Sequence, residues 1–586
     1  MTRKILVGFL AVIGGLVILG LLAYGGGSWI GKKRVPAKTV LEVDLERGLV
    51  EYVPDDPVAR YMLAKPQVLL DVVDALSRAS DDDRVVALVA RVGTAGMGMA
   101  QIQEVRDAVL AFRSQGKPAI AYGETFGEFG PGNAAYYLAT AFDEIYLQPS
   151  GDVSLTGLIF RSTFLRGTLD RLGVNPRVDH RQEYKSLKNL LTERKYTKPH
   201  REASRRVMES MFGQIVKGIS EARNLSVEEV QRIADRGPLL GKEAADAKLV
   251  DGLAYRDEVY ARMKEKAGGD AEYLSLSDYL CRAGRPHREG ATVALIYGVG
   301  SIRRGASRYH PALGRFFMGP DTVAAAFRSA IEDEEVKAIL FRVDSPGGSY
   351  VASDTIWRET VRAREAGKPV IVSMGNAAAS GGYMVSMAAN RIVAQPATVT
   401  GSIGVFAGKM VTSAFWEKVG VSFDEVHTSE NATLWTATED YTPAQWATLQ
   451  KILDRIYDDF TAKTARGRNL PRERVLEIAK GRAWTGEDAK SLGLVDELGG
   501  ISVALRLARE AAGISEGAPI RLKAFPERKP LWKRIWEKRS SVAEGTAAAL
   551  LEVLELAQPI VREAGDLGLA ASPGVQVVTE TEHAPE

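Results

Sequence analysis

The stretch from residue 376 to residue 385 reads Asn-Ala-Ala-Ala-Ser-Gly-Gly-Tyr-Met-Val, and the rest of the chain is organised around it. The apolar run just before it (370–372) is typical of a buried strand, and the residues after it have the composition of a buried helix. Gly381 and Gly382 clear space beside Ser380. A serine at such a junction lies near free backbone N–H groups, where a nucleophile and an oxyanion hole can share one pocket. The alternative is that Ser380 only caps the helix.

This stretch belongs to the second of two copies of a long internal repeat. Arg91 matches Arg342 at a separation of 251 positions, and Asp251 matches Asp496 at a separation of 245. A separation that drifts so little over a whole copy indicates duplication with small loop insertions. In each copy apolar strands alternate with helical stretches, which predicts an α/β fold with a largely parallel sheet.

The composition divides the 586 residues into five parts. We expect an N-terminal anchor and linker (1–38), a first repeat (39–263), a polar linker (264–290), a second repeat (291–525) and a tail (526–586). The net charge of +2 gives no indication of nucleic-acid binding. The single cysteine, Cys281, excludes an internal disulfide, and without a His or Cys cluster around it no metal site or cofactor is expected.

Two segments at the ends of the chain suggest contact with a membrane. Residues 5–24 carry no charge, and a helix of that length spans about 30 Å, enough to cross a bilayer. A cleaved secretory signal is the alternative, although the run is long for one. Basic residues flank both sides, so charge does not set the orientation. Residues 527–539 are basic with two tryptophans, which suits a helix on an anionic membrane surface or one docked on the domain. Beyond about residue 571 we expect disorder.

The duplication allows one copy to serve as a control for the other. The position matching Ser380 falls near Asn133, so the first copy lacks the serine. Conversely, Lys185 in the first copy aligns with Ala432 in the second. A serine found only in one copy and a lysine found only in the other are candidates for a nucleophile and its base.

The motifs together are similar to a known family. The first copy carries Glu-Tyr-Lys-Ser at 183–186, and the second carries Val-Asp-Ser-Pro-Gly-Gly at 343–348, Ala-Ala-Ser-Gly-Gly-Tyr-Met at 378–384 and Thr-Gly-Ser-Ile-Gly-Val at 400–405. With the N-terminal apolar run and the two repeats, this pattern resembles the long form of signal peptide peptidase A, a family of membrane-bound serine proteases. The resemblance implies a fold like that of Clp protease and the crotonases, repeated in tandem, with one N-terminal transmembrane helix.

The resemblance also implies a catalytic apparatus. Ser380 matches the nucleophile of a Ser–Lys dyad, and Lys185 matches its general base, which burial would keep neutral. The backbone N–H groups of Gly381 and Gly347 would hold the oxyanion, with Gly348 as the near alternative. Ser402 matches a hydroxyl that orients the lysine, or is simply a turn serine.

The family resemblance extends to surroundings and partners. It implies a homotetramer, no cofactor, and apolar peptide substrates left in the membrane by signal peptidase. It places a single-pass protein in the bacterial cytoplasmic membrane, in contact with lipid, with its catalytic domains on the periplasmic side.

Other interpretations stay open on sequence alone. His427 could serve as base to Ser380, although its match to His180 in the other copy favours a structural role. Ser345 could be the nucleophile, although the proline and glycines after it suit an oxyanion turn better. An acyl-CoA-processing enzyme of the crotonase type and a catalytically inactive membrane scaffold are the alternative functions.

Overall fold

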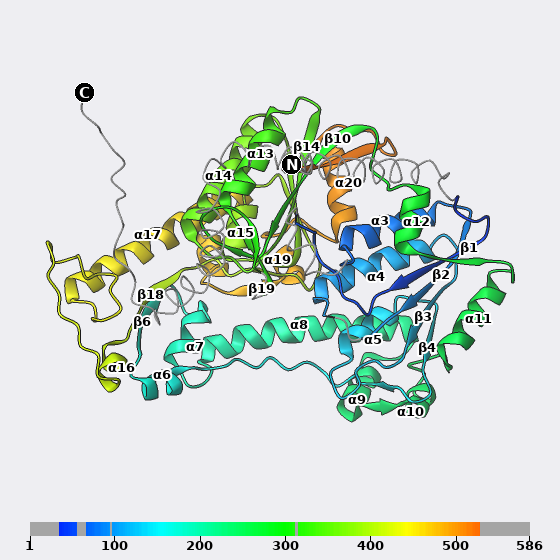
Figure 1. The fold of residues 1–586 in the computed structure, drawn as a ribbon, viewed down its shortest axis with the longest axis horizontal. Helices are drawn as coiled ribbons and strands as arrows, with labels where there is room; N and C mark the ends of the chain where they lie inside the picture. Colours follow the sequence, from blue (N-terminus) through cyan, green and yellow to red (C-terminus); the bar gives the residue numbers. More distant parts are fainter. Residues whose placement is uncertain (1–33, 55–65, 94–95, 311–313, 528–586) are drawn as a thin grey trace, which may run out of the picture.

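The computed structural model describes residues 34–54, 66–93, 96–310 and 314–527, and its main feature is two sheets of related design (Figure 1). The first sheet is parallel throughout and has the order β8-β4-β3-β2-β1-β9. Its strands are β1 (Thr39–Asp44), β2 (Val85–Arg91), β3 (Ala119–Gly123), β4 (Glu144–Leu147), β8 (Gly252–Leu253) and β9 (Glu272–Ser275).

The second sheet repeats this order as β20-β16-β15-β14-β10-β21. Two further strands, β17 (Val399–Gly401) and the antiparallel β19 (Ala483–Thr485), continue it beside the end of β15. The strands shared with the first sheet are β10 (Ala291–Val299), β14 (Val336–Ser345), β15 (Val370–Ala379), β16 (Arg391–Ala394), β20 (Glu497–Leu498) and β21 (Ile520–Phe525). The prediction of an α/β fold with tandem repeats is confirmed.

Helices follow the strands in matching order in the two copies. The first copy has α3 (Leu69–Ser80), α4 (Met99–Arg113), α5 (Asn133–Ala139), α6 (Arg166–Leu172), α7 (Asn189–Thr192), α8 (Lys198–Arg223), α9 (Val227–Arg236), α10 (Gly241–Asp246), α11 (Arg256–Lys266) and α12 (Leu276–Ala283). The second has α13 (Pro320–Glu332), α14 (Tyr350–Glu365), α15 (Gly381–Ser386), α16 (Ser413–Lys418), α17 (Pro443–Arg468), α18 (Arg472–Ile478), α19 (Gly486–Ser491) and α20 (Ile501–Ala511).

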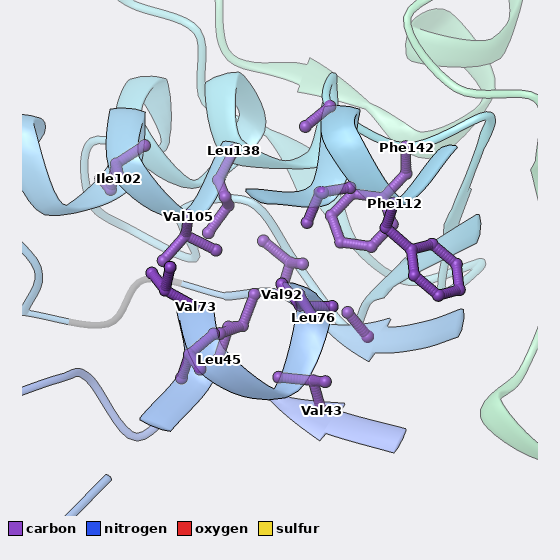
Figure 2. Packing of buried hydrophobic residues seen from close by; sticks show 14 of the residues in the cluster. Val43, Leu45, Val73, Leu76, Val92, Ile102, Val105, Phe112, Leu138 and Phe142 are labelled. Carbon is purple, nitrogen blue, oxygen red and sulfur yellow. The ribbon is translucent and has the colours of Figure 1, made fainter. Parts of the chain in front are cut away.

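Apolar residues at helical spacing explain how these helices cover the sheets. In α3, Leu69, Val72, Val73 and Leu76 fall on one face and are buried, so this face packs on the first sheet. Figure 2 shows Val73 and Leu76 beside strand residues, with helix residues of α4 and α5 closing the other side. The same cluster of buried side chains continues into the second copy through residues such as Leu340, so it joins the two repeats, and the second repeat has a further cluster around Phe341 and Val372.

The segment 264–290, expected to be a linker, is instead part of the first repeat. It contains β9, which pairs in parallel with β1, and α12, which packs against α3. Its polar composition misled the prediction because β9 is a short edge strand with few fully buried residues. By contrast, β21 ends at Phe525, the end expected for the second repeat.

Away from the two sheets, one strand from each copy forms a separate two-stranded pair. Strand β6 (Asn175–His180) of the first copy pairs antiparallel with β18 (Phe406–Val411) of the second. Helix α8 runs from the first sheet toward this pair in Figure 1 and contacts β19 of the second copy. Because of this pairing, the residues that follow β6 lie against the second repeat.

The remaining short elements lie in the loops. They are β5 (Asp152–Val153), β7 (Leu239–Leu240), β11 (Ser301–Ile302), β12 (Arg308–His310), β13 (Arg315–Met318) and the 3₁₀ helix η1 (Ser186–Lys188). Within the described ranges, no helix is long and apolar enough to cross a membrane. The apolar run 5–24 and the tryptophan-containing segment 527–539 lie outside those ranges, apart from residue 527.

Candidate active site

Ser380 stands at the junction between β15 and α15. Its backbone has φ +54° and ψ −117°, a conformation that residues other than glycine rarely adopt. Although Ser380 occupies the N-cap position, its side chain makes no capping hydrogen bond. The hydroxyl is therefore available for another partner, and the capping alternative does not account for it.

That partner is Lys185, which comes from the other repeat. The pairing of β6 with β18 is extended by a hydrogen bond from the Arg181 N–H to the Val405 carbonyl (2.9 Å), which leads the chain toward Ser380. Four residues later, Lys185 Nζ lies 3.0 Å from Ser380 Oγ. The structure thus brings together the serine and the lysine that each repeat carries alone.

Ser402 holds the other side of the lysine head group. Lys185 Nζ is 2.8 Å from the Ser402 carbonyl oxygen and 3.1 Å from its Oγ. A neutral amine has two N–H bonds and one lone pair. If the two N–H bonds are donated to Ser402, the lone pair is left facing the Ser380 hydroxyl. Of the two predicted roles for Ser402, the geometry fits the orienting one.

Burial sets the protonation state of this lysine. The Lys185 side chain is only 6% exposed, and among the described residues no carboxylate lies near enough to favour its charged form. Burial lowers the pKa of the Lys185 ammonium from 10.5 to about 7. A large share of the molecules therefore carries a neutral amine, able to accept a proton, at neutral pH.

Two glycines of the second repeat make room for the lysine stem. A Cβ at Gly481 would lie 2.6 Å from the Lys185 backbone nitrogen, and one at Gly404 would lie 3.3 Å from its Cδ. Gly481 also has a φ of +75°. A larger residue at Gly481 would displace the lysine from the serine.

The predicted oxyanion donors lie around Ser380, but the N–H of Gly348 is better placed than the predicted N–H of Gly347. A Cβ on Gly347 would lie 2.6 Å from the Gly381 nitrogen, so the two loops touch. The Gly347 N–H is already donated to Ser345 Oγ (3.2 Å), whereas the described contacts give no partner to the Gly348 N–H. Gly381 and Gly348 are therefore the better-placed pair of free donors. Ser345 is fully buried behind this turn, which does not suit a nucleophile.

The dyad opens into a large apolar cleft. The cavity has a volume of about 930 Å³, and both Ser380 and Lys185 line it. Apolar side chains from both repeats form much of the wall, among them Phe160, Leu187, Met384, Phe406 and Phe460. Such a cleft suits a ligand with apolar side chains.

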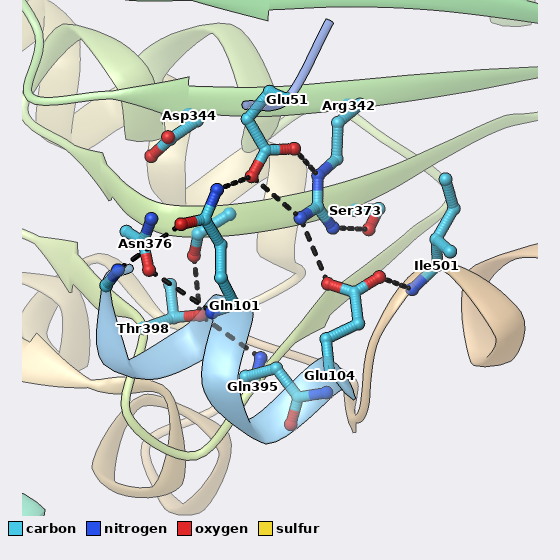
Figure 3. A network of polar contacts seen from close by, with 12 residues as sticks. Glu51, Gln101, Glu104, Arg342, Asp344, Ser373, Asn376, Gln395, Thr398 and Ile501 are labelled. Carbon is cyan, nitrogen blue, oxygen red and sulfur yellow. Dashed lines mark hydrogen bonds and ion pairs between the residues drawn. The ribbon is translucent and has the colours of Figure 1, made fainter. Parts of the chain in front are cut away.

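A buried polar network behind the site joins the two repeats (Figure 3). Arg342 on β14 is 1% exposed and donates to Glu51 Oε2 (2.8 Å) and to Glu104 Oε2 (3.0 Å) of the first repeat. The N–H of Gln101 donates to Asn376 Oδ1 (3.2 Å), close before the nucleophile. Strands β14 and β15, which carry the oxyanion turn and Ser380, are thus fixed by the first repeat.

Asp344 belongs to the same region and bears a perturbed carboxyl. It accepts the N–H of Ala377 (2.9 Å), which ties the oxyanion turn to the strand before Ser380. Burial raises the pKa of the Asp344 carboxyl to about 6, with the nearby Glu51 carboxylate adding to the effect. The sequence did not predict this role, although Asp344 lies inside a motif that it singled out.

The positions that match Ser380 and Lys185 in the opposite copies carry neither a nucleophile nor a base. Asn133 starts α5, and its side chain is bound to the local backbone: Oδ1 accepts the N–H of Gly157 (3.0 Å), and Nδ2 donates to the Gly157 carbonyl (2.8 Å). Ala432 and His427 are both exposed, and neither lines the cleft. His427 as base is therefore not supported.

His200 is a cleft residue that the sequence analysis missed. It lies on α8, is 6% exposed, and its Nδ1 is buried without a hydrogen-bond partner in the structure. The equivalent residue on α17, Gln445, donates its amide to the Glu430 carbonyl and to Thr433 Oγ1 (3.0 Å each). Comparison of the two copies could have drawn attention to His200, because only the first copy has a histidine there.

Comparison with known proteins identifies the family. The sequence profile of peptidase family S49 matches residues 111–270 and 362–515, one segment in each repeat. The chain belongs to peptidase family S49. It is accordingly a serine peptidase, and each of its two S49 segments covers part of one of the two sheets described above.

Several relatives extend the match across most of the chain. Protease 4 of Salmonella typhi is 35% identical over 460 residues, covering 76% of this chain and 72% of that protein. Protease 4 of Haemophilus influenzae is 32% identical, covering 75% and 72%. The chloroplastic serine protease SPPA of Arabidopsis thaliana is 31% identical, covering 75% and 64%. The resemblance to signal peptide peptidase A, inferred from the motifs, is confirmed.

Solved structures give weaker matches. A mutant of the membrane-bound stomatin-specific protease 1510-N is 14% identical with a TM-score of 0.25, covering 40% of this chain and 98% of that one. An enoyl-CoA hydratase from Polaromonas sp. JS666 is 19% identical with a TM-score of 0.21, covering 33% and 67%. The S49 assignment favours a peptidase over the acyl-CoA-processing enzyme and the inactive scaffold.

Proposed function

We propose that this S49 peptidase is a membrane-anchored endopeptidase that cleaves apolar peptides with a dyad of Ser380 and Lys185. The observation that carries the proposal is the 3.0 Å contact between Lys185 Nζ and Ser380 Oγ, made across the two repeats. At this contact Lys185 is buried, and burial brings the pKa of its ammonium to about 7. The lysine can therefore act as a base near neutral pH.

The reaction then proceeds in two halves. Ser380 Oγ attacks the peptide carbonyl carbon while Lys185 accepts the hydroxyl proton, and the N–H groups of Gly381 and Gly348 stabilise the oxyanion. As the C–N bond breaks, the Lys185 ammonium returns its proton to the leaving amine. Lys185 then takes a proton from the water that attacks the ester carbonyl carbon, and as the bond from that carbon to Ser380 Oγ breaks, the ammonium returns the proton to Oγ and the acid product leaves. The contacts with Ser402 keep the lysine head group beside the serine throughout.

The substrate class follows from the cleft and from the family. A cavity with an apolar wall of residues such as Phe160, Phe406 and Met384 favours peptides rich in apolar side chains. Remnants of cleaved signal peptides have this character, and one relative carries the name SPPA. Such peptides remain in the membrane after cleavage, so an enzyme that degrades them benefits from an anchor.

The location and assembly are part of the same proposal. The apolar run 5–24 would anchor the chain as a single span in the bacterial cytoplasmic membrane, with the catalytic repeats on the periplasmic side. We further propose a homotetramer, as the family resemblance implies. Alkaline extraction of membranes tests the anchor: the intact chain should stay with the lipid, and a chain lacking residues 1–33 should be released.

Peptide hydrolysis by the detergent-purified enzyme tests the catalytic roles. Ser380→Ala and Lys185→Ala should each lose activity, with the assembly state and thermal stability checked for both. Thr400→Ser is a useful control, because Thr400 is buried in the same motif as Ser402 and its hydroxyl donates to the Ala378 carbonyl (2.8 Å), away from the lysine head group. Near-normal activity of Lys185→Ala would show that the base lies elsewhere.

A further inference from the structure

A short segment of the second repeat, residues 480–482 between α18 and β19, binds the chain around Lys185. The carbonyl of its first residue accepts the N–H of Tyr184 (3.2 Å), and that of its third residue accepts the N–H of Ser402 (2.7 Å). The carbonyl of its second residue accepts the Ser402 hydroxyl (3.4 Å). This segment therefore contacts both the residue that precedes the lysine and the serine that contacts its amine.

The side chain of Arg482 connects this segment to the first repeat. Its guanidinium lies 4.8 Å from the ring centroid of Tyr184 and 4.5 Å from that of Trp484. It also donates to Glu202 Oε1 on α8 (2.6 Å), and the Tyr184 hydroxyl donates to the other oxygen of the same carboxylate (3.1 Å). Arg482, Tyr184 and Glu202 thus contact one another around the residue that precedes Lys185.

Two of these three side chains stay out of the substrate cleft. Tyr184 lines the cavity that contains the dyad, whereas Arg482 and Glu202 are not among the residues that line it. The Arg482 side chain is 15% exposed and that of Glu202 is 56% exposed. Any effect of Arg482 on catalysis must therefore pass through the residues that it contacts, and not through the substrate.

All three side chains are absent from the other copy of the repeat. The separation between matching positions is 247 residues near Tyr184 and 245 residues at Glu202 and Arg482. The matching residues are Asn431 for Tyr184, Ala447 for Glu202 and Gly237 for Arg482. The group thus has the same one-sided distribution as the serine and the lysine of the dyad.

Contacts that hold the common fold, by contrast, are present in both copies. The Tyr136 hydroxyl donates to the Leu249 carbonyl (2.7 Å), and the matching Tyr383 hydroxyl donates to the Leu494 carbonyl (3.0 Å). The contacts of Arg482 occur only beside the site where a serine and a lysine meet. The repeated fold by itself does not require them.

We propose that Arg482 is a positioning residue, which acts through Tyr184 to keep Lys185 beside the reactive serine. The inference rests on the dyad proposed above. Residues 181–185 belong to no helix or strand, so their position depends on contacts with other parts of the chain. An arginine that is stacked on an aromatic ring and bonded to a carboxylate has a fixed orientation, which suits this role.

Loss of this support should change the titration of Lys185 as well as its position. Its pKa is lowered to about 7 by burial, and a segment that moves away from the second repeat admits water, which raises the pKa toward 10.5. The charged side chains at this junction form two pairs, Glu183 with Lys480 (3.6 Å) and Glu202 with Arg482 (2.6 Å). Removal of Arg482 leaves the Glu202 charge unpaired, which acts on the lysine in the same direction.

Hydrolysis of an apolar fluorogenic peptide by full-length detergent-purified protein, between pH 6 and pH 10, tests this role. In Arg482→Gln, kcat at pH 7 should fall about tenfold or more while KM stays within about twofold, and the midpoint of kcat/KM should move up by about one pH unit. Arg206→Gln is the matched control and should keep wild-type values. Arg206 also joins α8 to the second repeat, through Asp488 (2.6 Å), and its described contacts include neither Tyr184 nor residues 480–482.

A second variant tests whether the three side chains act as one unit. Glu202→Gln changes an exposed position, so the chain should fold, and it should lower kcat about threefold. In the double variant with Arg482→Gln, kcat should lie within about twofold of that of Arg482→Gln alone, because the two changes disrupt the same contact. Fully additive losses would contradict a shared role.

Lys185→Ala, measured alongside, separates this proposal from the proposed function. If Lys185→Ala stays active, the dyad itself is wrong. If Lys185→Ala is inactive while Arg482→Gln keeps the wild-type kcat, or loses kcat with an unchanged midpoint, the dyad stands and the positioning role is wrong. Thermal unfolding confirms that each variant is folded.

Discussion

The pH dependence of hydrolysis follows directly from the burial of Lys185. Lowering its pKa from 10.5 to about 7 corresponds to about 5 kcal/mol of disfavoured charge. Only the neutral amine can accept the Ser380 proton, so kcat/KM should rise with pH. With this pKa the neutral fraction is about one-tenth at pH 6 and about nine-tenths at pH 8, which predicts a rise of about ninefold and then a plateau. The assay is hydrolysis of an apolar fluorogenic peptide between pH 5 and pH 10.

The titration of a second group near the site, the Asp344 carboxyl, must be distinguished from that of Lys185. The pKa of Asp344 is raised to about 6, and this carboxyl supports the oxyanion turn. In Asp344→Asn the overall rate can fall, but the midpoint of the rise should stay near pH 7. A midpoint that disappears in this variant would assign the rise to Asp344 instead of Lys185.

The same pKa predicts a change in stability that needs no substrate. The unfolded lysine holds its proton up to about pH 10.4, whereas the folded one releases it above about pH 7. Since the unfolded state binds more protons between these values, stability should rise with pH there by up to about 1.4 kcal/mol per pH unit. Lys185→Met should lack this contribution when the two proteins are compared by urea unfolding. A constant difference from pH 7 to pH 9, or a kinetic midpoint at pH 9 or above, would refute the reasoning.

The remaining predictions concern the supports of the site and its wall. Gly98→Ala places a methyl group against the side chain of Asn376, so it should cost about 1–3 kcal/mol of stability and lower kcat. Gly96→Ala is the control, because open space surrounds its Cβ position and neither quantity should change. Urea unfolding measures the stability of both variants, and peptide hydrolysis measures their kcat. Arg342→Met leaves two buried carboxylates unpaired and should cost about 3–5 kcal/mol in the same unfolding assay, and a loss below 1 kcal/mol would contradict the network. His200→Phe should raise KM up to about tenfold at constant kcat if the imidazole binds substrate, and an unchanged KM would exclude that contact.

Much of this architecture could be predicted from the sequence because the duplication supplied a comparison. Matching apolar runs predicted matching strands, and the structure has the same strand order in both sheets. The serine and the lysine were identified because each is absent from the other repeat. Their contact could not be derived that way, since it depends on the pairing of β6 with β18, two short strands with ordinary sequences.

The features that were missed depend on tertiary contacts. An edge strand needs little apolar character, so the polar sequence around β9 predicts a linker where the structure has a strand. The choice between Gly347 and Gly348 depends on which N–H the Ser345 hydroxyl occupies, and no sequence pattern specifies this. The network of Arg342 could not be found either, because its carboxylates come from distant parts of the chain.

The most direct test of the central claim is covalent labelling with a serine-directed fluorophosphonate, followed by peptide mapping. The account predicts a single adduct on Ser380 that forms about ninefold faster at pH 8 than at pH 6 and is lost in Lys185→Met. An adduct on Ser345, or labelling of Ser380 at an undiminished rate in Lys185→Met, would contradict the cross-repeat dyad.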